Sequence, residues 1–221
     1  RLDSGDLAYL TKEVRRMLDA AGLEDCRIIA SNSLDEYSIT SIIDQGAKID
    51  AFGVGERLIT AKSDPVFGAV YKIAAIEKRG VVRPTIKVSE AVEKITNPGR
   101  KKVYRVYDTT GHAVCDLIAL EGETVDLSEP YRVVDPVKPW KDIRLVDCTC
   151  RELLRPVIRD GRRVAEPRDL KEIREYVDRQ LREEIWQEEQ RFENPHIHHM
   201  DMSPTYYEFK MDLLRKADDF N

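Results

Sequence analysis

Arg1-Leu2-Asp3-Ser4-Gly5-Asp6 opens the chain and leads directly into an amphipathic segment at Leu7 to Ala21. Apolar residues recur in this segment at helical spacing, at Leu7, Leu10, Val14, Met17 and Leu18. The hexad combines an arginine, two carboxylates and a Ser-Gly turn. Arginine binds phosphate or carboxylate groups through paired hydrogen bonds, and carboxylates hold hydroxyl groups or magnesium-bound water. We therefore expect the hexad to be a polar strand end, the place where α/β folds build their sites.

Two further strand–helix units follow the hexad. Arg27 to Ser31 has the pattern of a short buried strand, and a helix is predicted from Leu34 to Gln45. The next strand, at Ile49 to Phe52, leads into Gly53-Val54-Gly55-Glu56-Arg57. Alternating strands and helices indicate parallel pairing with right-handed crossovers. The fold class is therefore α/β, and residues 1–64 are predicted to be the last units of a β/α barrel or of an open α/β sheet.

A different pattern begins after Pro65. Glycine, proline or asparagine separates short apolar runs at residues 69–76, 85–88, 102–107 and 113–120, which are predicted to be antiparallel strands. Residues 130–140 contain three prolines and are predicted to be an extended connection. Helical patterns return at residues 170–191 and 204–216, the second with Pro204 in its first position. The predicted domains are therefore a β-rich part with its connection at 65–166 and C-terminal helices at 167–221.

Composition narrows the class of protein. The net charge of −5 argues against a general nucleic-acid binder, and no apolar run approaches the roughly 20 residues that span a bilayer. Four cysteines in 221 residues do not form a disulfide framework, so a reducing, cytoplasmic location is expected. We expect no nucleic-acid partner and no membrane partner.

Polar or glycine-rich turns follow three consecutive strands: Ser4-Gly5, Ser31-Asn32-Ser33 and Gly53-Val54-Gly55. The carboxyl ends of parallel strands share one face, so these turns are expected to form one polar rim. Gly53 and Gly55 would let backbone N–H groups approach a phosphate closely. Asp3 and Asp6 would hold ribose hydroxyls or magnesium-bound water.

Each turn also has a simpler interpretation. A lone Gly-x-Gly is more often a tight turn than a phosphate cradle. Asp6 is equally well explained as the N-cap of the helix that follows it, and Ser31 to Ser33 as the cap of the helix at Leu34. The interpretation of these turns as a binding site depends on all three lying at the same edge of the parallel strands.

In order and spacing, seven motifs resemble those of the nicotinate phosphoribosyltransferases. They are Arg1 to Leu7, Ser31-Asn32 with Leu34-Asp35-Glu36, Gly53 to Leu58, Gly68 to Lys72, Glu93-Lys94-Ile95-Thr96-Asn97-Pro98-Gly99, Arg151 to Leu154 and Asn194-Pro195-His196. The resemblance extends over nearly the whole chain. The hexad combined with the run from Lys94 to Gly99 is the most specific part.

The resemblance implies a reaction, a fold and partners. Members of this family make nicotinate mononucleotide from nicotinate and phosphoribosyl pyrophosphate, the entry step of NAD salvage. ATP hydrolysis drives the reaction through a phosphohistidine, and magnesium takes part. The implied fold is an irregular, TIM-like β/α barrel packed on a second domain, and the enzymes are typically dimers with the active site near the subunit interface.

The resemblance also implies roles for residues of this chain. Arg1 would lie against nicotinate and phosphate, and Asp3 would bind the ribose hydroxyls or magnesium; these two are the predicted catalytic residues. Ser31, Asn32 and Ser33 would contact the nucleotide. Backbone N–H groups of Gly53, Gly55 and Glu56 would hold the 5′-phosphate. Some members have a small hydroxyl residue where this chain has Glu56, and a carboxylate is unfavourable beside phosphate, so its side chain is expected to point away.

The family's phosphohistidine lies upstream of the hexad, and none of His112, His196, His198 and His199 occupies its motif. We therefore expect this chain to be the C-terminal part of a longer or split enzyme, with a second copy or the missing N-terminal half as partner. Two alternatives stay open. One is a catalytically incomplete binding or assembly subunit that offers the helix at 170–191 to a partner, although that helix is more readily expected to cover the β-rich domain. The other is a related nicotinamide or quinolinate phosphoribosyltransferase.

A metal-binding module is a further alternative. Cys148-x-Cys150 and His196-x-His198-His199 offer zinc ligands. Cys-x-Cys is not the usual spacing of structural zinc sites, and no sequence pattern brings the two clusters together. Two semi-buried thiols and a polar loop explain them more simply.

Overall fold

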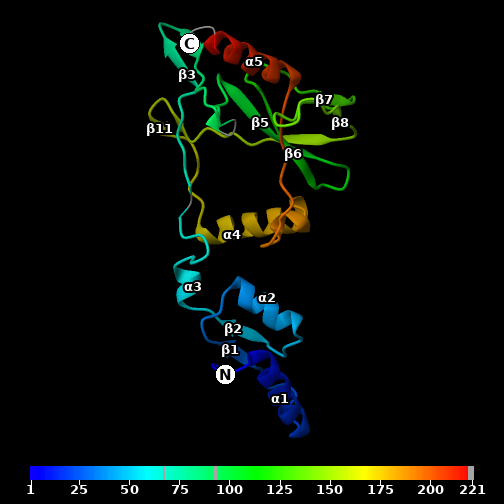
Figure 1. Ribbon diagram of the computed structural model, residues 1–221. Coiled ribbons are helices and arrows are strands. Elements are labelled where there is room, and N and C mark those ends of the chain that lie inside the picture. The colour runs from blue at the N-terminus through cyan, green and yellow to red at the C-terminus, as the bar shows by residue number, and fades with distance from the viewer. Residues whose placement is uncertain (67, 92–93, 219–221) are drawn as a thin grey trace. The chain divides into compact units, whose positions relative to one another are not determined.

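Figure 1 shows the chain as a computed structural model that describes residues 1–66, 68–91 and 94–218. The chain divides into two compact units, Arg1–Val70 and Tyr71–Asn221. Glu93, the first residue of the run that ends at Gly99, lies outside the described residues. Within the described ranges, no helix has the length and apolar character needed to cross a membrane.

Short parallel strands form the centre of the N-terminal unit. β1 (Ile29–Ser31) pairs in parallel with β2 (Ala51–Gly53), and Ser31 is in register with Gly53. Leu2 makes a parallel bridge to Ala30, because its N–H donates to the carbonyl of Ile29 at 2.8 Å and its own carbonyl accepts from the N–H of Ser31 at 2.9 Å. The predicted parallel pairing is confirmed. Both strands are shorter than predicted.

Helices connect and follow these strands. α1 (Leu7–Ala20) begins after Asp6, and α2 (Glu36–Asp44) begins after Asp35, which forms a capping box with Ser38. α3 (Glu56–Ile59) is a single turn. The predicted helix start at Leu34 is wrong, because Leu34 is buried in the core of this unit with Leu7 and Ala30, and the capping oxygen comes from Asp35.

A four-stranded sheet in the order β12-β6-β5-β9 organises the C-terminal unit. β5 (Lys101–Tyr107) and β6 (Ala113–Leu120) are antiparallel, and β6 has the predicted bounds. β9 (Thr149–Glu152) is antiparallel to β5, and β12 (Met200–Met202) is parallel to β6. The structure therefore joins the predicted helical range 167–221 to the β-rich range 65–166 in one sheet.

Two-stranded hairpins provide further strands. They are β3 (Ala75–Lys78) with β4 (Val81–Pro84), β7 (Tyr131–Val133) with β8 (Ile143–Leu145), and β10 (Ile158–Arg159) with β11 (Arg162–Arg163). Arg79 and Gly80 connect β3 to β4 with φ of 53° and 76°, as a tight two-residue hairpin turn requires. The strands predicted at 69–76 and 85–88 are therefore displaced, because this turn pairs the residues next to it. The connection predicted at 130–140 contains β7.

The single helix predicted at 170–191 is wrong. α4 (Leu170–Arg179) continues as the π-helix η2 (Gln180–Glu184), and the 3-10 helix η3 (Gln187–Gln190) follows after a break. At the break, Ile185 is extended and Trp186 stacks on His112, with ring centroids 4.0 Å apart. Tertiary contacts have overridden the helical pattern here. No residue of α4 is buried, so this helix does not cover the β-rich domain as expected.

α5 (Pro204–Asp218) has the predicted Pro204 in its first position and packs on β6 (Figure 1). The turn Asn97-Pro98-Gly99 is bonded to this helix. Tyr206 is fully buried, and its hydroxyl donates to the carbonyl of Pro98 at 2.9 Å. Gly99 has φ of 77°, and a Cβ added to it would lie 3.0 Å from Phe209. The end of this run is therefore held in place by its packing against α5.

Gly99→Ala is expected to destabilise the protein for two separable reasons. Alanine is strained at positive φ, which costs about 1 kcal/mol, and its methyl group would press on Phe209, which adds about 1–3 kcal/mol. Gly161 has φ of 72° with nothing within 4 Å of its added Cβ, so Gly161→Ala measures the first cost alone. Urea denaturation should give a larger loss for Gly99→Ala. Equal losses would contradict the packing role.

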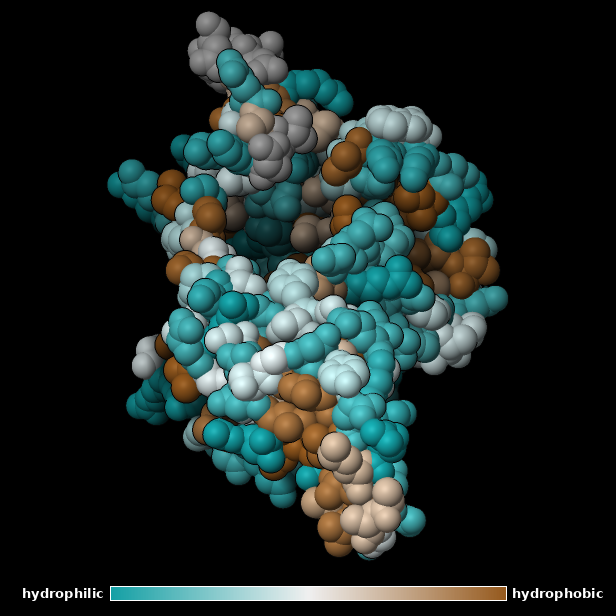
Figure 2. Space-filling view, turned by 60° about the horizontal axis from the view of Figure 1, so that its bottom comes forward, coloured by the Kyte–Doolittle hydropathy of each residue, from teal (hydrophilic) through white to brown (hydrophobic). Residues whose placement is uncertain are grey.

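Large apolar side chains reach the surface in several places (Figure 2). In the C-terminal unit they include Leu170, Ile173 and Val177, which share one face of α4. Monomeric soluble proteins rarely expose large contiguous apolar patches, because such surface drives association.

We predict that the isolated 221-residue chain associates in solution. Sedimentation velocity should show species heavier than 25.5 kDa, and the exposed face of α4 should contribute. Ile173→Lys with Val177→Glu should reduce the association, whereas Lys171→Glu with Glu175→Lys, on exposed charged positions of the same helix, should leave it unchanged. A monodisperse 25.5 kDa species that melts cooperatively would contradict this prediction.

Candidate functional site

The carboxyl ends of Leu2, β1 and β2 meet at one edge of the N-terminal unit. Parallel pairing places Leu2 beside β1 and Ser31 beside Gly53, so the residues that follow each segment leave at the same edge. Asp3, Asn32 and Val54 are the first residues beyond the three segments. The structure thus brings the three predicted turns together as a single rim.

Asp3 and Ser31 form a hydrogen-bonded pair at this rim. The Ser31 hydroxyl donates to Oδ1 of Asp3 at 2.7 Å, although the two residues are 28 positions apart. Oδ2 of Asp3 lies 3.8 Å from the guanidinium of Arg1, and about half of the Asp3 side chain is exposed. Asp3 is therefore oriented by Ser31 and remains open to a ligand, whereas Arg1 is more exposed and more weakly held.

The loop after β1 has an unusual backbone. Asn32 and Ser33 have φ of 107° and 46°, a region that residues other than glycine seldom adopt. Such strain persists where surrounding structure maintains it, and it is frequent at functional sites. Both side chains are exposed, and neither caps α2. The simpler interpretation of Ser31 to Ser33 as a helix cap is therefore wrong.

The loop after β2 approaches β1 closely. A Cβ added to Gly53 would lie 3.3 Å from Cβ of Ser31, so a side chain at this position would crowd the hydroxyl that orients Asp3. Gly55 precedes α3, whose first N–H groups have no acceptor within the helix. The Glu56 carboxylate lies 3.9 Å from Lys62 Nζ and is mostly exposed. Of the two glycines in this loop, Gly53 is thus the one whose small size matters, because a Cβ added to Gly55 would have nothing within 4 Å.

Asp6 does not belong to the rim's binding groups. Its Oδ1 accepts the N–H of Tyr9 at 3.0 Å and caps α1, so its interpretation as an N-cap is confirmed.

Sequence reasoning missed an ion pair that joins two of the loops. Arg57 on α3 donates to Oδ2 of Asp35, the cap of α2. The pair connects the loop after β1 to the loop after β2. Asp35 lies two positions after Ser33 and Arg57 lies two positions after Gly55, but no local sequence pattern signals that the two residues pair.

The histidine and cysteine clusters do not converge. The described residues include no group of three or more His, Cys, Asp or Glu side chains that could hold a metal ion. Burial raises the pKa of the Cys148 thiol, which opposes the thiolate that zinc requires. The zinc alternative gains no support from this arrangement.

His198 instead lies in a chain of charged groups in the C-terminal unit. Its Nδ1 is 3.1 Å from Glu189, and its Nε2 is 3.4 Å from Oδ1 of Asp116. Arg105 donates two hydrogen bonds to Asp116, at 2.9 and 3.0 Å. Burial alone would raise the pKa of Asp116, but the guanidinium of Arg105, with help from His198, holds it below its usual value.

Glu184 is the centre of a second network in this unit. It accepts hydrogen bonds from the hydroxyl of Tyr107, the guanidinium of Arg151 and the amide of Gln180. Burial, followed by the hydrogen bond to Glu184, raises the pKa of Tyr107 to about 12. These bonds join η2 to β5 and β9, and they account for the position of the Arg151 motif.

Asp116→Asn is expected to destabilise the protein by about 2 kcal/mol at neutral pH, because hydrogen bonds to charged groups contribute about 1.5–3 kcal/mol. A depressed pKa in the folded state stabilises the fold above about pH 4, and this contribution is lost as pH falls further. Asp116→Asn should therefore also flatten the loss of stability in acid. Asp142→Asn removes the same charge from an exposed pair and is the matched control. Equal behaviour of the two variants in urea denaturation would exclude the proposed role of Asp116.

Comparison with known proteins identifies the family of this chain. The family model described as the nicotinate phosphoribosyltransferase C-terminal domain matches residues 100–210. The nicotinate phosphoribosyltransferase of Bacillus subtilis is 40% identical over 218 residues, which are 98% of this chain and 44% of that protein. The Caenorhabditis elegans protein of the same name is 33% identical over 220 residues, which are 95% of this chain and 38% of that protein.

The chain belongs to the nicotinate phosphoribosyltransferase family. The predicted resemblance is thus confirmed. The chain spans less than half the length of these curated relatives.

A solved structure of the family shares the fold of this chain. The crystal structure of human nicotinic acid phosphoribosyltransferase superposes with a TM-score of 0.71 at 23% identity. The match covers 97% of this chain and 40% of the human chain. The mixed α/β class predicted from the sequence agrees with this neighbour.

In this member of the nicotinate phosphoribosyltransferase family, the family model matches only the C-terminal unit, whereas the full-length relatives match both units. The family model spans the sequence from β5 to the middle of α5, in the C-terminal unit. The rim of Asp3, Ser31 and Gly53 precedes that stretch, and the matches of 95% or more to the relatives extend over both units.

Proposed function

We propose that this chain is part of an enzyme that forms nicotinate mononucleotide from nicotinate and phosphoribosyl pyrophosphate, with ATP hydrolysis, in NAD salvage. The observation that carries the proposal is the contact of Ser31 with Asp3 at the joint carboxyl ends of parallel strands, beside Gly53. Family membership supplies the reaction class. The TIM-like barrel, of which residues 1–64 would be the last units, belongs to the same proposal, and so does a second domain in which the β-rich range 65–166 and the range 167–221 are joined.

In this proposal, the rim binds the sugar phosphate. Displacement of pyrophosphate at C1 of ribose develops positive charge on the sugar, which a nearby carboxylate stabilises. Asp3 is held for that role by the Ser31 hydroxyl, and its oxygens can accept hydrogen bonds from ribose hydroxyls. Arg1 would neutralise phosphate charge from the exposed side, as a predicted catalytic partner of Asp3.

The loops of the rim would bind the remainder of the nucleotide. Backbone N–H groups of Gly53, Gly55 and Glu56 would donate to the 5′-phosphate, while the Glu56 carboxylate is drawn towards Lys62. Asn32 and Ser33 expose side chains and backbone beside Ser31, where they would donate to the nucleotide. Nicotinate needs positioning more than activation, because its ring nitrogen is already a nucleophile.

The rim fits magnesium as a phosphate-bound ion. Magnesium is usually held by one or two carboxylates together with substrate phosphates. Asp3 offers one half-exposed carboxylate, and its orientation is set by Ser31. When bound, magnesium would neutralise charge on the pyrophosphate group. The proposal also includes ATP as co-substrate and a dimer with the site near its interface. The enzyme would act in the cytoplasm, where the four free cysteines would stay reduced.

Asp3→Asn is expected to lower kcat/KM for nicotinate mononucleotide formation in the full-length enzyme by at least about 100-fold, because it removes charge where positive charge develops. Asp6→Asn is the control from the same hexad. Asparagine caps helices as well as aspartate does, so this variant should retain activity within about twofold. Product formation from nicotinate and phosphoribosyl pyrophosphate is measured with and without ATP.

Three outcomes would reject the proposal. Full activity of Asp3→Asn would remove Asp3 from the reaction. Preference for nicotinamide or quinolinate over nicotinate would assign the chain to the related transferases. Absence of any product from the wild-type enzyme would favour a binding or assembly subunit.

A further inference from the structure

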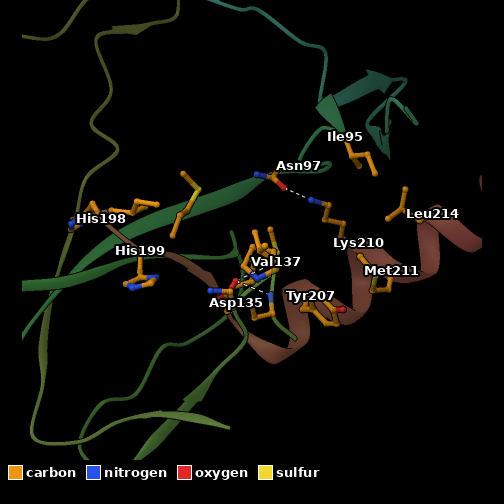
Figure 3. Close-up of a pocket in the computed structure, with 15 residues that line it drawn as sticks. Ile95, Asn97, Asp135, Val137, His198, His199, Tyr207, Lys210, Met211 and Leu214 are labelled. Atoms are coloured by element: carbon orange, nitrogen blue, oxygen red, sulfur yellow. Dashed lines mark hydrogen bonds between the residues drawn. The ribbon is translucent and has the colours of Figure 1, made fainter. Parts of the chain in front are cut away.

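A pocket of about 660 Å³ lies in the C-terminal unit, between α5, the loop after β7 and the strand β12. Figure 3 shows its lining, with Lys210 and Met211 on α5 and Asp135 and Val137 on the loop. Most of the lining is apolar, and three methionines, Met200, Met202 and Met211, contribute to it. Pockets of about 300–1,000 Å³ with apolar walls and few polar groups suit small organic ligands.

Lys210 is the charged group that distinguishes this pocket. The residue is only 9% exposed, yet no carboxylate among the described residues forms an ion pair with it. Its Nζ has one hydrogen bond, to Oδ1 of Asn97 at 2.8 Å (Figure 3). An ammonium group carries three donors, so Lys210 retains donors for a ligand. Burial lowers its pKa, because apolar surroundings disfavour the charged form of the ammonium group.

The other charged groups near the pocket do not neutralise Lys210. Oδ1 of Asp135 accepts the N–H groups of Val137 and Lys138, at 2.8 and 3.1 Å, so this carboxylate is used by its own loop. A second ammonium, that of Lys101, donates to the carbonyl of Asn97 at 2.8 Å and adds positive charge at the same turn. An anion bound at Lys210 would therefore supply a counter-charge that the described residues do not provide.

We propose that this pocket binds an apolar monocarboxylate, whose carboxylate accepts hydrogen bonds from Lys210 and whose body packs on Met200, Met211 and Leu214. A single negative charge matches Lys210, the buried lysine of the lining, which forms no ion pair with the described residues. The other lysine of the lining, Lys138, is exposed. A phosphate dianion would need more donors, and Asp135 would repel its two charges more strongly than the single charge of a carboxylate. The flexible methionine side chains would adapt to either an aliphatic or an aromatic body.

The positions of the methionines provide a direct test. The chain has four methionines: Met200, Met202 and Met211 line the pocket, and Met17 lies in the N-terminal unit. Octanoate is added to the full-length protein labelled with ¹³C on its methionine methyl groups, and the spectra are followed by NMR. The Met200 and Met211 signals should shift in a saturable manner, whereas the Met17 signal should not move.

Calorimetric titration then tests the charge. Octanoate should bind at least tenfold more tightly than octanol, and octylammonium should bind more weakly still. Lys210→Met, which keeps the apolar stem, should lower octanoate affinity at least tenfold. Lys216→Met is the matched control, because Lys216 lies on the same helix, is exposed and already pairs with Asp212. This control should leave octanoate affinity unchanged.

Several results would overturn the proposal. Equal binding of octanoate and octanol to the wild-type protein would show an apolar pocket with no carboxylate site. Equal loss of affinity in Lys210→Met and Lys216→Met would show a general charge effect. If Lys210→Met does not fold, Lys210→Arg keeps the cation, and loss of the methionine shifts in that folded variant supports a site built for the ammonium. Absence of octanoate-induced shifts in the wild-type protein would by itself reject the pocket as a monocarboxylate site.

Discussion

The parallel register of Ser31 with Gly53, and of Ala30 with Leu2, is the constraint on which the candidate site depends. A slip of one residue would turn Ser31 away from Asp3 and place another residue against Gly53. The register is maintained by a small core in which Leu7, Ala30 and Leu34 are buried. A few apolar contacts thus determine the position of the polar groups, and the Ser31–Asp3 hydrogen bond follows from them rather than causing them.

The C-terminal unit depends on long-range polar anchors to a greater degree. Tyr206 and Lys210 of α5 bond to Pro98 and Asn97, and Glu184 joins η2 to β5 and β9. Each of these hydrogen bonds satisfies a buried or half-buried polar group. Because buried polar groups need such partners, the bonds determine where each helix can lie. The pocket beside Lys210 is a product of the same arrangement, because α5 is held to the turn at one point and leaves space next to it.

Sequence reasoning succeeded where the signal was local and repeated. The alternation of strand and helix up to Gly53 predicted the parallel pairing, and the continuous apolar run at 113–120 predicted β6 to the residue. It failed where distant residues decided the outcome. Helical periodicity continued past Glu184, but Tyr107, Arg151 and the stacking of Trp186 on His112 ended the helix. The rim could be predicted because parallel topology is regular, whereas the partners of Arg57 and Lys210 could not, because nothing in the local sequence encodes them.

The anchor between Tyr206 and Pro98 also affects the order in which the chain folds during synthesis. The two residues are 108 positions apart, and β12 completes the edge of the sheet beside β6 only after residue 202 has been made. At about 5–20 residues per second, the ribosome needs roughly 5–20 s to add that stretch. From the synthesis of Leu120 to that of Met200, β6 presents an unpaired edge, and the surface that α5 will cover is open to solvent. The nascent C-terminal unit must therefore remain protected from mispairing until α5 has emerged.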